Sequence, residues 1–300
     1  MNRKVNILRR SLGMLLPFLF LNPLVAASQK YEVSGVLLQV DKEHATMSVS
    51  CREIPGFMDA MVMPFRVRDS KMLIGLEPGM SIDFSLVVEK SSSFAEDIHA
   101  HPFESLELDP VQARRYKLME NAMATKSAAA DVLHVGQLVP DFALIDQHRQ
   151  RVSLSQFSGK IVAITFIYTR CPRPDYCVRL SNNFGVLQRK LKSNMGRDLI
   201  LLTVVIDPAN DQPEALTQYT RIWKADARSW HFLTGPSSDI EQLCQKFDMA
   251  FYPDEALLVH SFHTVVIDRE GKLAANLEGN DFTVQQLADL VESVMAPSHQ

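Results

Sequence analysis

Several features that would point to a familiar class of protein are missing from this sequence. Basic residues do not outnumber acidic ones, since 31 Lys and Arg stand against 35 Asp and Glu. No basic stripe is present either, which argues against nucleic acid or an anionic membrane as partner. No apolar run offers the roughly 20 residues of a comfortable membrane span, and no internal repeat is visible. With 300 residues, the chain is long enough for two domains with separate cores.

The first 27 residues resemble a secretory leader. A basic start, MNRKVNILRR, precedes an apolar run that Pro17 and Pro23 interrupt, and small residues offer a cleavage site after Ala27. No cysteine follows the run, so a lipoprotein anchor is not expected. We therefore expect a Sec-type signal peptide over residues 1–27 and export to the periplasm, with membrane attachment only through an uncleaved leader. Loss of this segment takes the net charge from −4 to −8, because it holds four basic and no acidic residues.

Residues 30–98 have the pattern of a small all-β domain. Turn signals such as DKEH and EPG separate four strand-like segments: YEVSGVLLQVD, ATMSVS, MVMPFRVRD and MSIDFSLVVE. Several short strands in so short a stretch predict a five-stranded barrel of the OB type. The following stretch, SSSFAEDIHAHPFESLELDP, has no clear core pattern. We expect residues 99–134 to form a linker, helical over VQARRYKLMENAMATKSAAADV.

From residue 135 to residue 300 the pattern is that of an α/β domain. IVAITFI and LILLTVVI are continuous apolar runs, as expected of strands buried on both faces of a sheet. Between them lies a helix whose apolar residues share one face: Leu180, Phe184, Leu187 and Leu191. Further helices are predicted over QPEALTQYTRIW, DIEQLCQKF and TVQQLADLVESVM, and a hairpin over HTVVIDREGKLAANL. This order of elements fits the thioredoxin-like plan.

Two cysteines, Cys171 and Cys177, lie where the first buried strand meets its helix. Pro172 biases Cys171 toward extended backbone, and Pro174 argues against a helical loop. Cys177 falls in the first helical turn, where free N–H groups and the helix dipole would lower its pKa. In an exported protein the pair can be a structural disulfide, a thiol–disulfide switch or a set of Cu(I) ligands.

A third partner would distinguish these alternatives. In a dithiol enzyme of this fold, the strand facing the cysteines usually begins with a cis-proline, and aligning HTVVIDREG with that strand puts His263 in this place. His260, three residues earlier, can face the cysteine loop from the preceding turn. Two thiolates and one imidazole form a soft three-coordinate set suited to Cu(I), with room for Cu(II) and an added oxygen ligand. We expect His260 to be the ligand and His263 to be structural.

Four segments spread over about 135–296 resemble the Sco/SenC family of thioredoxin-like, copper-binding assembly factors for cytochrome c oxidase: YTRCPRPDYC, VVIDPANDQPEAL, WHFLTG and HSFHTVVIDREGK. The family uses two cysteines of the first loop and one distal histidine, which by matching residues are Cys171, Cys177 and His260. Much of the family has three residues between its cysteines, whereas this chain has five. This departure keeps thiol–disulfide chemistry open as an alternative.

The first domain carries a second group of sulfur side chains, in CREIPGFMDAMVMPF. Met61 and Met63 alternate on a predicted strand, so their thioethers point to one face, and Met58 and Cys51 flank them across the turn IPG. Core methionine is the usual interpretation of such a pattern. Thioether and thiolate donors nevertheless select Cu(I) over harder ions, which makes a second copper site a hypothesis.

Residues 31–98 resemble the CusF-like periplasmic copper-binding domain. The resemblance rests on GVLLQVDKEHATMSV, on IPGFM with the following M-x-MPF, and on GLEPGMSIDFSLVV. In that family a histidine and two methionines bind Cu(I) or Ag(I), beneath a tryptophan in the best known members. Met61 and Met63 match the methionine pair, Cys51 stands in the place of the histidine, and Met58 stands near that of the tryptophan. Both departures keep a soft donor, although a cysteine is oxidisable.

Other polar residues have simpler interpretations. Asp207 and Asp211 belong to the Sco/SenC pattern, and Asp211 is expected to cap the helix that follows rather than to act in catalysis. Cys244 is expected to be a buried apolar cysteine. His99 and His101 could add copper ligands, but a solvated strand end is the interpretation we favour.

Together the two resemblances imply an exported copper protein that delivers copper to the dinuclear copper site of a terminal cytochrome oxidase, or keeps its thiols reduced. Its partner would be the copper-bearing oxidase subunit or another periplasmic copper protein. Delivery by ligand exchange needs no turnover, so we expect a metallochaperone rather than an enzyme. The alternatives are a periplasmic thiol–disulfide oxidoreductase and a copper-resistance buffer. A peroxidase is not expected, because Thr169 is only two residues before Cys171 and the Thr-x-x-Cys arrangement of peroxiredoxins is absent.

Overall fold

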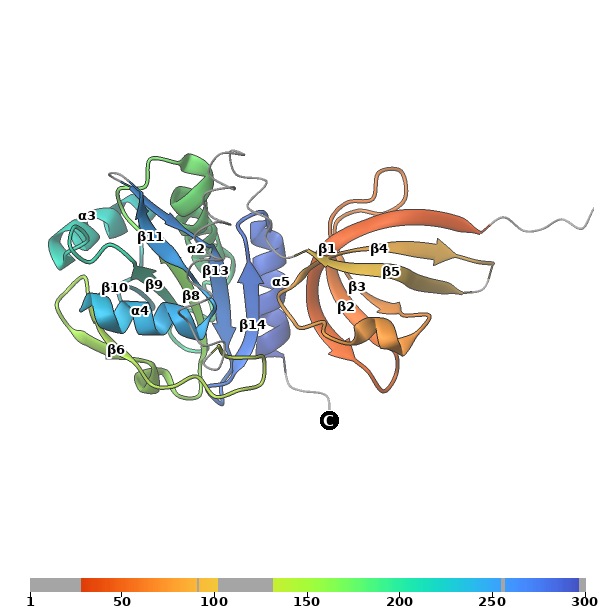
Figure 1. The fold of residues 1–300 in the computed structure, drawn as a ribbon, viewed down its shortest axis with the longest axis horizontal. Coiled ribbons are helices and arrows are strands. Elements are labelled where there is room, and N and C mark those ends of the chain that lie inside the picture. The colour runs from red at the N-terminus through yellow and green to blue at the C-terminus, as the bar shows by residue number, and fades with distance from the viewer. Residues whose placement is uncertain (1–27, 91, 102–131, 255–256, 297–300) are drawn as a thin grey trace, which may run out of the picture.

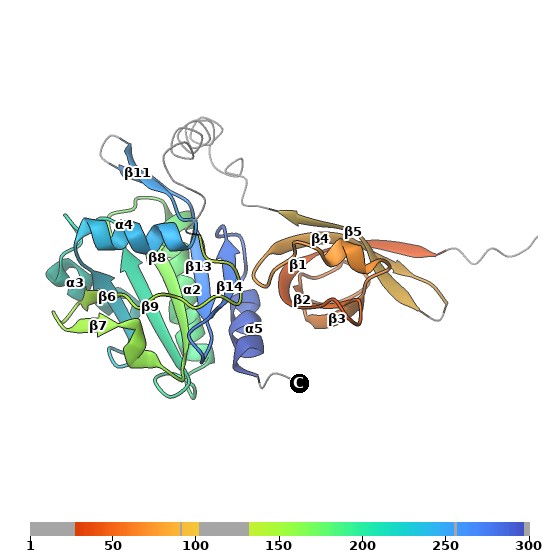
Figure 2. The ribbon, with the colours of Figure 1, turned by 60° about the horizontal axis from the view of Figure 1, so that its bottom comes forward.

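The computed structural model describes residues 28–90, 92–101, 132–254 and 257–296. Its strands form a five-stranded sheet, a seven-stranded sheet and a small two-stranded sheet. Figures 1 and 2 show the two larger sheets in separate halves of the molecule, with helix α5 (Val284–Met295) at their border. The predicted leader and nearly all of the predicted linking helix lie outside the described residues.

The N-terminal sheet is antiparallel throughout, with the strand order β3-β2-β1-β4-β5. Its strands are β1 (Gln29–Asp41), β2 (Thr46–Cys51), β3 (Val62–Arg66), β4 (Ser81–Val88) and β5 (Ser93–His101), with a 3-10 turn at Ser70–Leu73. One face of this sheet builds its own core, in which the rings of Phe65 and Phe84 meet edge to face at 4.9 Å. The all-β prediction for this region is therefore confirmed.

The fifth strand was not located by the sequence patterns, which found no clear core pattern in residues 93–101. β5 lies at an edge of the sheet, and Ala95 is its one buried residue. An edge strand that buries so little leaves no alternation for a sequence pattern to detect. A single parallel bridge between Val67 and Ala95 links β5 to the chain just after β3. Closure into an OB-type barrel stays a prediction.

The C-terminal sheet has the order β14-β13-β8-β9-β10-β6-β7. Its central strands β8 and β9 are parallel and buried along their whole length, as their apolar runs predicted. The strands are β6 (Ala143–Asp146), β7 (Arg151–Ser153), β8 (Ile161–Ile167), β9 (Leu199–Val205), β10 (Trp230–Thr234), β13 (His263–Ile267) and β14 (Leu273–Glu278). The further elements are α2 (Arg179–Lys190), α3 (Pro213–Trp223), α4 (Ser237–Lys246), the hairpin β11 (Phe251–Asp254) with β12 (Leu257–His260), and a 3-10 turn at Leu154–Phe157.

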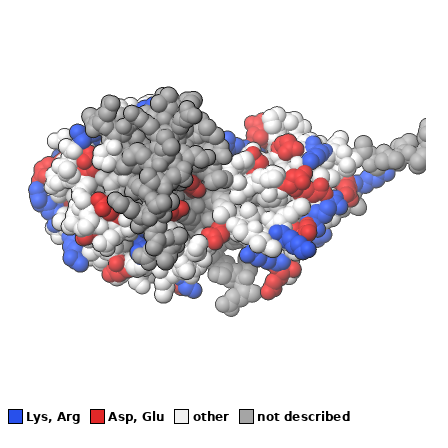
Figure 3. All heavy atoms as spheres, in the orientation of Figure 1, with Lys and Arg blue, Asp and Glu red and all other residues white. Residues whose placement is uncertain are grey.

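Two expectations from the composition, a surface without a basic stripe and helices too short or too polar to span a membrane, can be compared with the described residues. On the face seen in Figure 3, acidic and basic side chains are interspersed over both halves of the molecule. None of the helices in the described residues combines the length and the apolar character that a membrane crossing needs.

Helix α5 joins the two halves through an apolar and a polar contact. Val36 and Leu38, on the outward face of β1, belong to the apolar core of the C-terminal half and not to the core of their own sheet. Beside them, Gln286 Nε2 donates to the carbonyl oxygen of Ser50 at 3.1 Å, and Ser50 Oγ donates to Asp289 at 2.6 Å. Because the apolar residues are buried between the halves, separating the halves would expose them to water.

A tight turn at Gly79 makes a further contact between the halves. Gly79 has a φ of +96°, and a Cβ there would lie 2.7 Å from the backbone oxygen of Asn276 on β14. Gly75 has a similar φ of +81°, but a Cβ at that position would meet no atom within 4 Å. Both glycines therefore supply a left-handed backbone, and Gly79 also permits close packing on β14.

We predict that Gly79→Ala destabilises the chain by about 1–3 kcal/mol more than Gly75→Ala. The two variants share the strain of placing alanine at positive φ, and the first alone drives a methyl group into the backbone of β14. Urea-induced unfolding followed by circular dichroism measures the difference. Equal losses in the two variants would show that the Gly79 contact contributes nothing.

Candidate metal centre

Cys171, Cys177 and His260 come from two segments that meet beyond the end of β8. The cysteine loop follows β8, whereas His260 ends β12, just before β13, which pairs with β8. The Sγ of Cys177 lies 3.5 Å from Nε2 of His260. All four cysteines of the chain are free thiols. The structure thus brings the imidazole and one thiol into contact.

The ring of His260 is neutral, and its Nε2 lone pair faces Cys177. Nδ1 lies 2.8 Å from the carbonyl oxygen of Ser261, which can only accept, so Nδ1 carries the proton and donates it. Burial lowers the pKa of His260 to about 4. The rings of Tyr168 and Phe262 pack edge-on against it, with centroids at 6.0 and 4.7 Å. A buried imidazole of fixed tautomer is the form that ligates a metal ion.

The two thiols of the loop differ in their protonation. Cys177 is fully buried, and desolvation raises its pKa well above the ordinary value. Cys171 is half-buried, and its pKa is lowered to about 6, chiefly because Cys177 donates a hydrogen bond to its sulfur. Our expectation that the helix dipole lowers the pKa of Cys177 is therefore wrong. Burial outweighs the dipole, and the thiolate at neutral pH is that of Cys171.

The cysteine loop contains one π-helical turn, Pro174–Val178, with Tyr176 off helical geometry at φ −108° and ψ −111°. The expectation that Pro174 prevents helical structure is wrong, because a proline is tolerated at the first position of a helical turn. The ring of Tyr176 stacks under the Arg173 guanidinium at 4.7 Å and meets the Phe262 ring at 5.0 Å. The wide turn accommodates the five-residue spacing and returns Cys177 to the side of Cys171.

The two residues that precede Cys171 are held in place by the aspartates of DPANDQP. Asp211 is fully buried and accepts hydrogen bonds from the backbone N (3.0 Å) and the Oγ1 of Thr169. Arg170 donates to Asp207 at 2.7 Å. The prediction that Asp211 caps the next helix is wrong, because Gln212 occupies the N-cap of α3. The two aspartates instead hold the residues just before Cys171, a role that the sequence analysis missed although both lie in the family pattern.

The remaining candidates in this half have structural surroundings. His263 is buried, and its Nδ1 lies 3.0 Å from Oδ1 of Asn276 on the neighbouring strand, in agreement with a structural role. Cys244 is fully buried on α4, as predicted. Within the described residues, no three His, Cys, Asp or Glu side chains stand close enough together to hold a metal ion. A three-ligand site of Cys171, Cys177 and His260 would therefore require these three side chains to move closer together.

The sulfur side chains of the N-terminal sheet gather at one end of β2 and β3. Val49 lies opposite Met63, and the backbone N of Cys51 donates to the carbonyl oxygen of Met61 at 2.9 Å, so Cys51 lies opposite Met61. Residues directly opposite each other point to one face, as do Met61 and Met63 at i and i+2. Cys51 is 2% exposed and Met61 is 47% exposed. The group therefore extends from the core to the surface.

The other soft donors divide between this group and the far edge of the sheet. Met58 packs against the same core as Cys51, whose pKa burial raises to about 12. His99 and His101 are exposed on β5, the strand at the edge opposite β3, and His101 Nε2 lies 2.5 Å from Asp83. The solvated strand end that we favoured for these histidines agrees with this position.

Comparison with known proteins identifies the C-terminal half. The profile described as SCO1/SenC matches residues 131–296, more than half of the chain. The chain belongs to the SCO1/SenC family. The profile described as copper binding periplasmic protein CusF matches residues 30–100, so this family member carries a CusF-like region before its Sco region.

Relatives with known names match about half of this chain. Protein sco1 of Schizosaccharomyces pombe is 30% identical over 168 residues, which are 52% of this chain and 60% of that protein, less than two thirds of its length. The SCO1 protein homolog of Bacillus subtilis is 27% identical over 164 residues, 53% of this chain and 82% of that protein.

Solved structures share the fold of about half of this chain. A crystal structure described as a putative electron transfer protein from Aquifex aeolicus VF5 has a TM-score of 0.50 at 21% identity, covering 55% of this chain and 97% of that one. This likeness confirms the thioredoxin-like fold predicted for the C-terminal half. Yeast Sco1 with copper bound is 26% identical, with a TM-score of 0.46 over 54% of this chain and 91% of that one.

The difference between the thiols predicts a pH dependence. Alkylation of Cys171 by iodoacetamide should fall to half its maximal rate near pH 6 and level off above about pH 7, because the thiolate reacts and its pKa is about 6. Mass spectrometry of the Cys171 peptide from the reduced chain gives the rate, with buried Cys244 as the unreactive internal control. A rate that still rises between about pH 8 and 9, as for an ordinary thiol of pKa about 8.5, would contradict the assignment.

Proposed function

We propose that this Sco/SenC protein binds Cu(I) through Cys171, Cys177 and His260 and serves the dinuclear copper site of a terminal cytochrome oxidase. It would either deliver the ion or keep the thiols of that site reduced. The observation that carries the proposal is the unprotonated Nε2 of a buried histidine, 3.5 Å from the Sγ of Cys177. A relative from Stutzerimonas stutzeri that is described as a putative copper-binding protein, 24% identical over 144 residues, supports the choice of metal.

The donor set fits copper as a cargo. Two thiols and a neutral imidazole are soft ligands that select Cu(I), and the aromatic rings of Tyr168 and Phe262 exclude water around the imidazole. Cys171 is the half-buried member of the set. Its thiolate is therefore the ligand that an incoming donor or a recipient can reach first, which suits transfer by ligand exchange.

We extend the proposal to a second site in the CusF-like region, built on Met61 and Met63 with Cys51 and Met58. The profile match to a copper binding periplasmic protein supports it, as does the register that sets Cys51 opposite Met61. We further propose that this sheet is an OB-type barrel, a closure that the bridge between Val67 and Ala95 favours. The same profile match supports export to the periplasm, in line with the leader-like start of the sequence.

A thiol–disulfide oxidoreductase is the second candidate, and the unequal thiols favour it. The half-buried Cys171 thiolate would attack a partner disulfide, and buried Cys177 would then displace the partner thiolate. The partner gains two electrons and is released as a dithiol, and the chain keeps a Cys171–Cys177 disulfide. This route needs no copper at either site.

A titration of the reduced full-length chain with Cu(I) should reach about two equivalents, one for each soft-donor site. His260→Ala should lower the affinity of one equivalent by at least about 100-fold, since even loss of an outer-shell group costs 10–100-fold. Met61→Ala with Met63→Ala should remove the other. Competition against a Cu(I) chelator measures both affinities.

Matched variants separate ligands from structural residues in this titration. His263→Gln changes a buried histidine on the same segment, and Met72→Ala removes a methionine that is 37% exposed elsewhere in the N-terminal half. Both should retain about two equivalents. No copper uptake at Cys171 and Cys177, together with fast dithiol exchange, would leave the oxidoreductase as the function.

The recipient is tested in cells grown under copper limitation. A strain without this chain should lose oxidase activity, and the wild-type chain should restore it, as should His263→Gln. Neither His260→Ala nor Cys177→Ala should restore it, because each removes a proposed ligand. Normal oxidase activity in the deletion strain, combined with greater copper sensitivity, would instead identify a copper-resistance buffer.

A further inference from the structure

A short connection between β14 and α5, residues 279–283, contacts the cysteine loop. Asn280 Nδ2 donates to the carbonyl oxygen of Asp175, inside the loop, at 2.5 Å. Arg179, two residues after Cys177, donates to the carbonyl oxygen of Asp281 at 3.2 Å, and its guanidinium lies 3.8 Å from the Asp281 carboxylate. The connection is therefore tied to both sides of Cys177.

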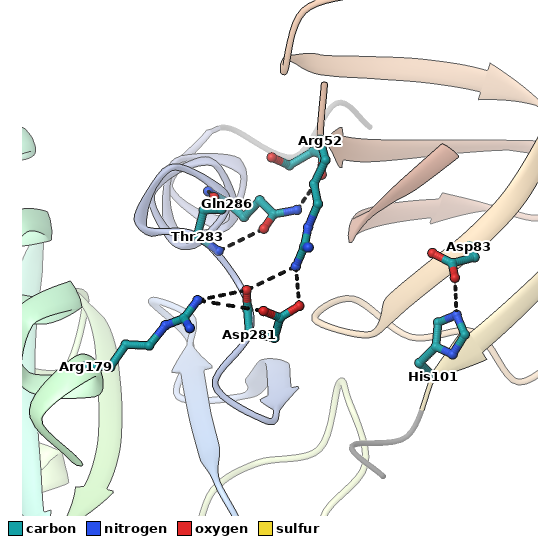
Figure 4. A network of polar contacts seen from close by, with 8 residues as sticks. Arg52, Asp83, His101, Arg179, Asp281, Thr283 and Gln286 are labelled. Carbon is teal, nitrogen blue, oxygen red and sulfur yellow. Dashed lines mark hydrogen bonds and ion pairs between the residues drawn. The ribbon is translucent and has the colours of Figure 1, made fainter. Parts of the chain in front are cut away.

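The same connection also contacts the N-terminal half, next to Cys51. Arg52 donates to the Asp281 carboxylate at 2.5 Å and to its carbonyl oxygen at 3.1 Å. Figure 4 shows the guanidinium groups of Arg52 and Arg179 reaching Asp281 from two different parts of the chain. We call Arg52, Arg179, Asn280 and Asp281 the Asp281 junction. It links the residue after Cys51 to the turn that holds Cys177.

A cavity of about 150 Å³ lies beside this junction, on the border of the two halves. Cys51 and Met61 line it from the N-terminal half, and Thr283, Gln286 and Asp289 line it from the start of α5. We call Cys51, Met58, Met61 and Met63 the sulfur group. Its exposed end, at Met61, therefore borders the half that carries the Cys171–Cys177 loop.

We infer that the sulfur group of the N-terminal half is the copper donor for the Cys171–Cys177–His260 site of the same chain. The inference rests on the proposed function and names the partner of that site. Copper stays Cu(I) throughout, so no oxidant or reductant is needed. Its bonds to the Cys51 sulfur and the methionine thioethers break as bonds to the loop thiolates and His260 form. Cys177 releases its proton to water, and Cys51 takes one up.

The direction of transfer follows from the charge of the two ligand sets. Cys171 and Cys177 offer two thiolates, whereas the donor offers one thiolate, Cys51, and neutral thioethers. Two negative charges attract a cation more strongly than one, so copper moves toward the loop. The Asp281 junction keeps donor and acceptor together, which replaces a bimolecular encounter by an effective concentration within one molecule.

The test uses the reduced full-length chain with one equivalent of Cu(I). Rapid alkylation at intervals and mass spectrometry report when the metal protects Cys171, the reactive thiol of the loop. We expect Cys171 to stay reactive at first, while the N-terminal half holds the metal, and to become protected later, with a rate that does not change over a tenfold range of protein concentration. Immediate protection of Cys171, a rate proportional to protein concentration, or a Cys171 that stays reactive after one equivalent has bound would overturn the inference. Copper that never reaches the loop even in excess would overturn the proposed function as well.

A charge reversal tests the role of the junction. Asp281→Lys removes the partner of Arg52 and Arg179 and adds a repelling charge, without touching a proposed ligand. It should slow the transfer about fivefold or more, the lower end of typical coupling between sites. Glu214→Lys is the matched control, because Glu214 pairs with Arg149 at 2.5 Å inside the C-terminal half, and it should leave the rate unchanged. Equal rates in Asp281→Lys, Glu214→Lys and the wild type would remove the junction from the mechanism.

Discussion

The burial of a neutral imidazole against a thiol is the interaction on which the C-terminal site depends. A buried ring must satisfy its N–H, and the carbonyl oxygen of Ser261 does so at Nδ1 of His260. The other nitrogen is then left as a lone pair, and the short hairpin β11–β12 ends so that this lone pair meets Cys177. The orientation of one hydrogen bond thereby decides that the ring presents a lone pair, and not a proton, to Cys177.

A polar side chain with two roles also helps to hold the two halves together. Gln286 closes the capping box of α5 by accepting from the backbone N of Thr283 at 2.9 Å, and its Nε2 is left to reach Ser50 in the other half. A side chain that already stabilises the start of a helix thus also docks that helix. Around it, Val36 and Leu38 supply the apolar contact that the polar bonds orient. The arrangement of the two halves follows from one helix that serves both.

Sequence patterns predicted the all-β character of the N-terminal half and the thioredoxin-like fold of the C-terminal half, because long apolar runs and motif spacing are local signals. They failed where the outcome depends on contacts between distant segments. Asp211 has the sequence context of a helix cap, and nothing local shows that Thr169 lies within its reach. The helix dipole predicts an acidic Cys177, but the depth of burial that raises its pKa is set by the whole domain. β5 was missed because it is an edge strand with a single buried residue, which leaves no alternation of apolar and polar residues to detect.

The position of Cys51 has a consequence for the durability of the N-terminal site. In a CusF-like region this residue stands in the place of a histidine, and a lone thiol outside the cytosol is normally at risk from peroxides and from mixed disulfides. Both reactions need an accessible thiolate. With 2% of its surface exposed and a pKa raised to about 12, Cys51 presents neither. If Cys51 is a copper ligand as proposed, shielding of this kind would protect its thiol from oxidation while the site is empty.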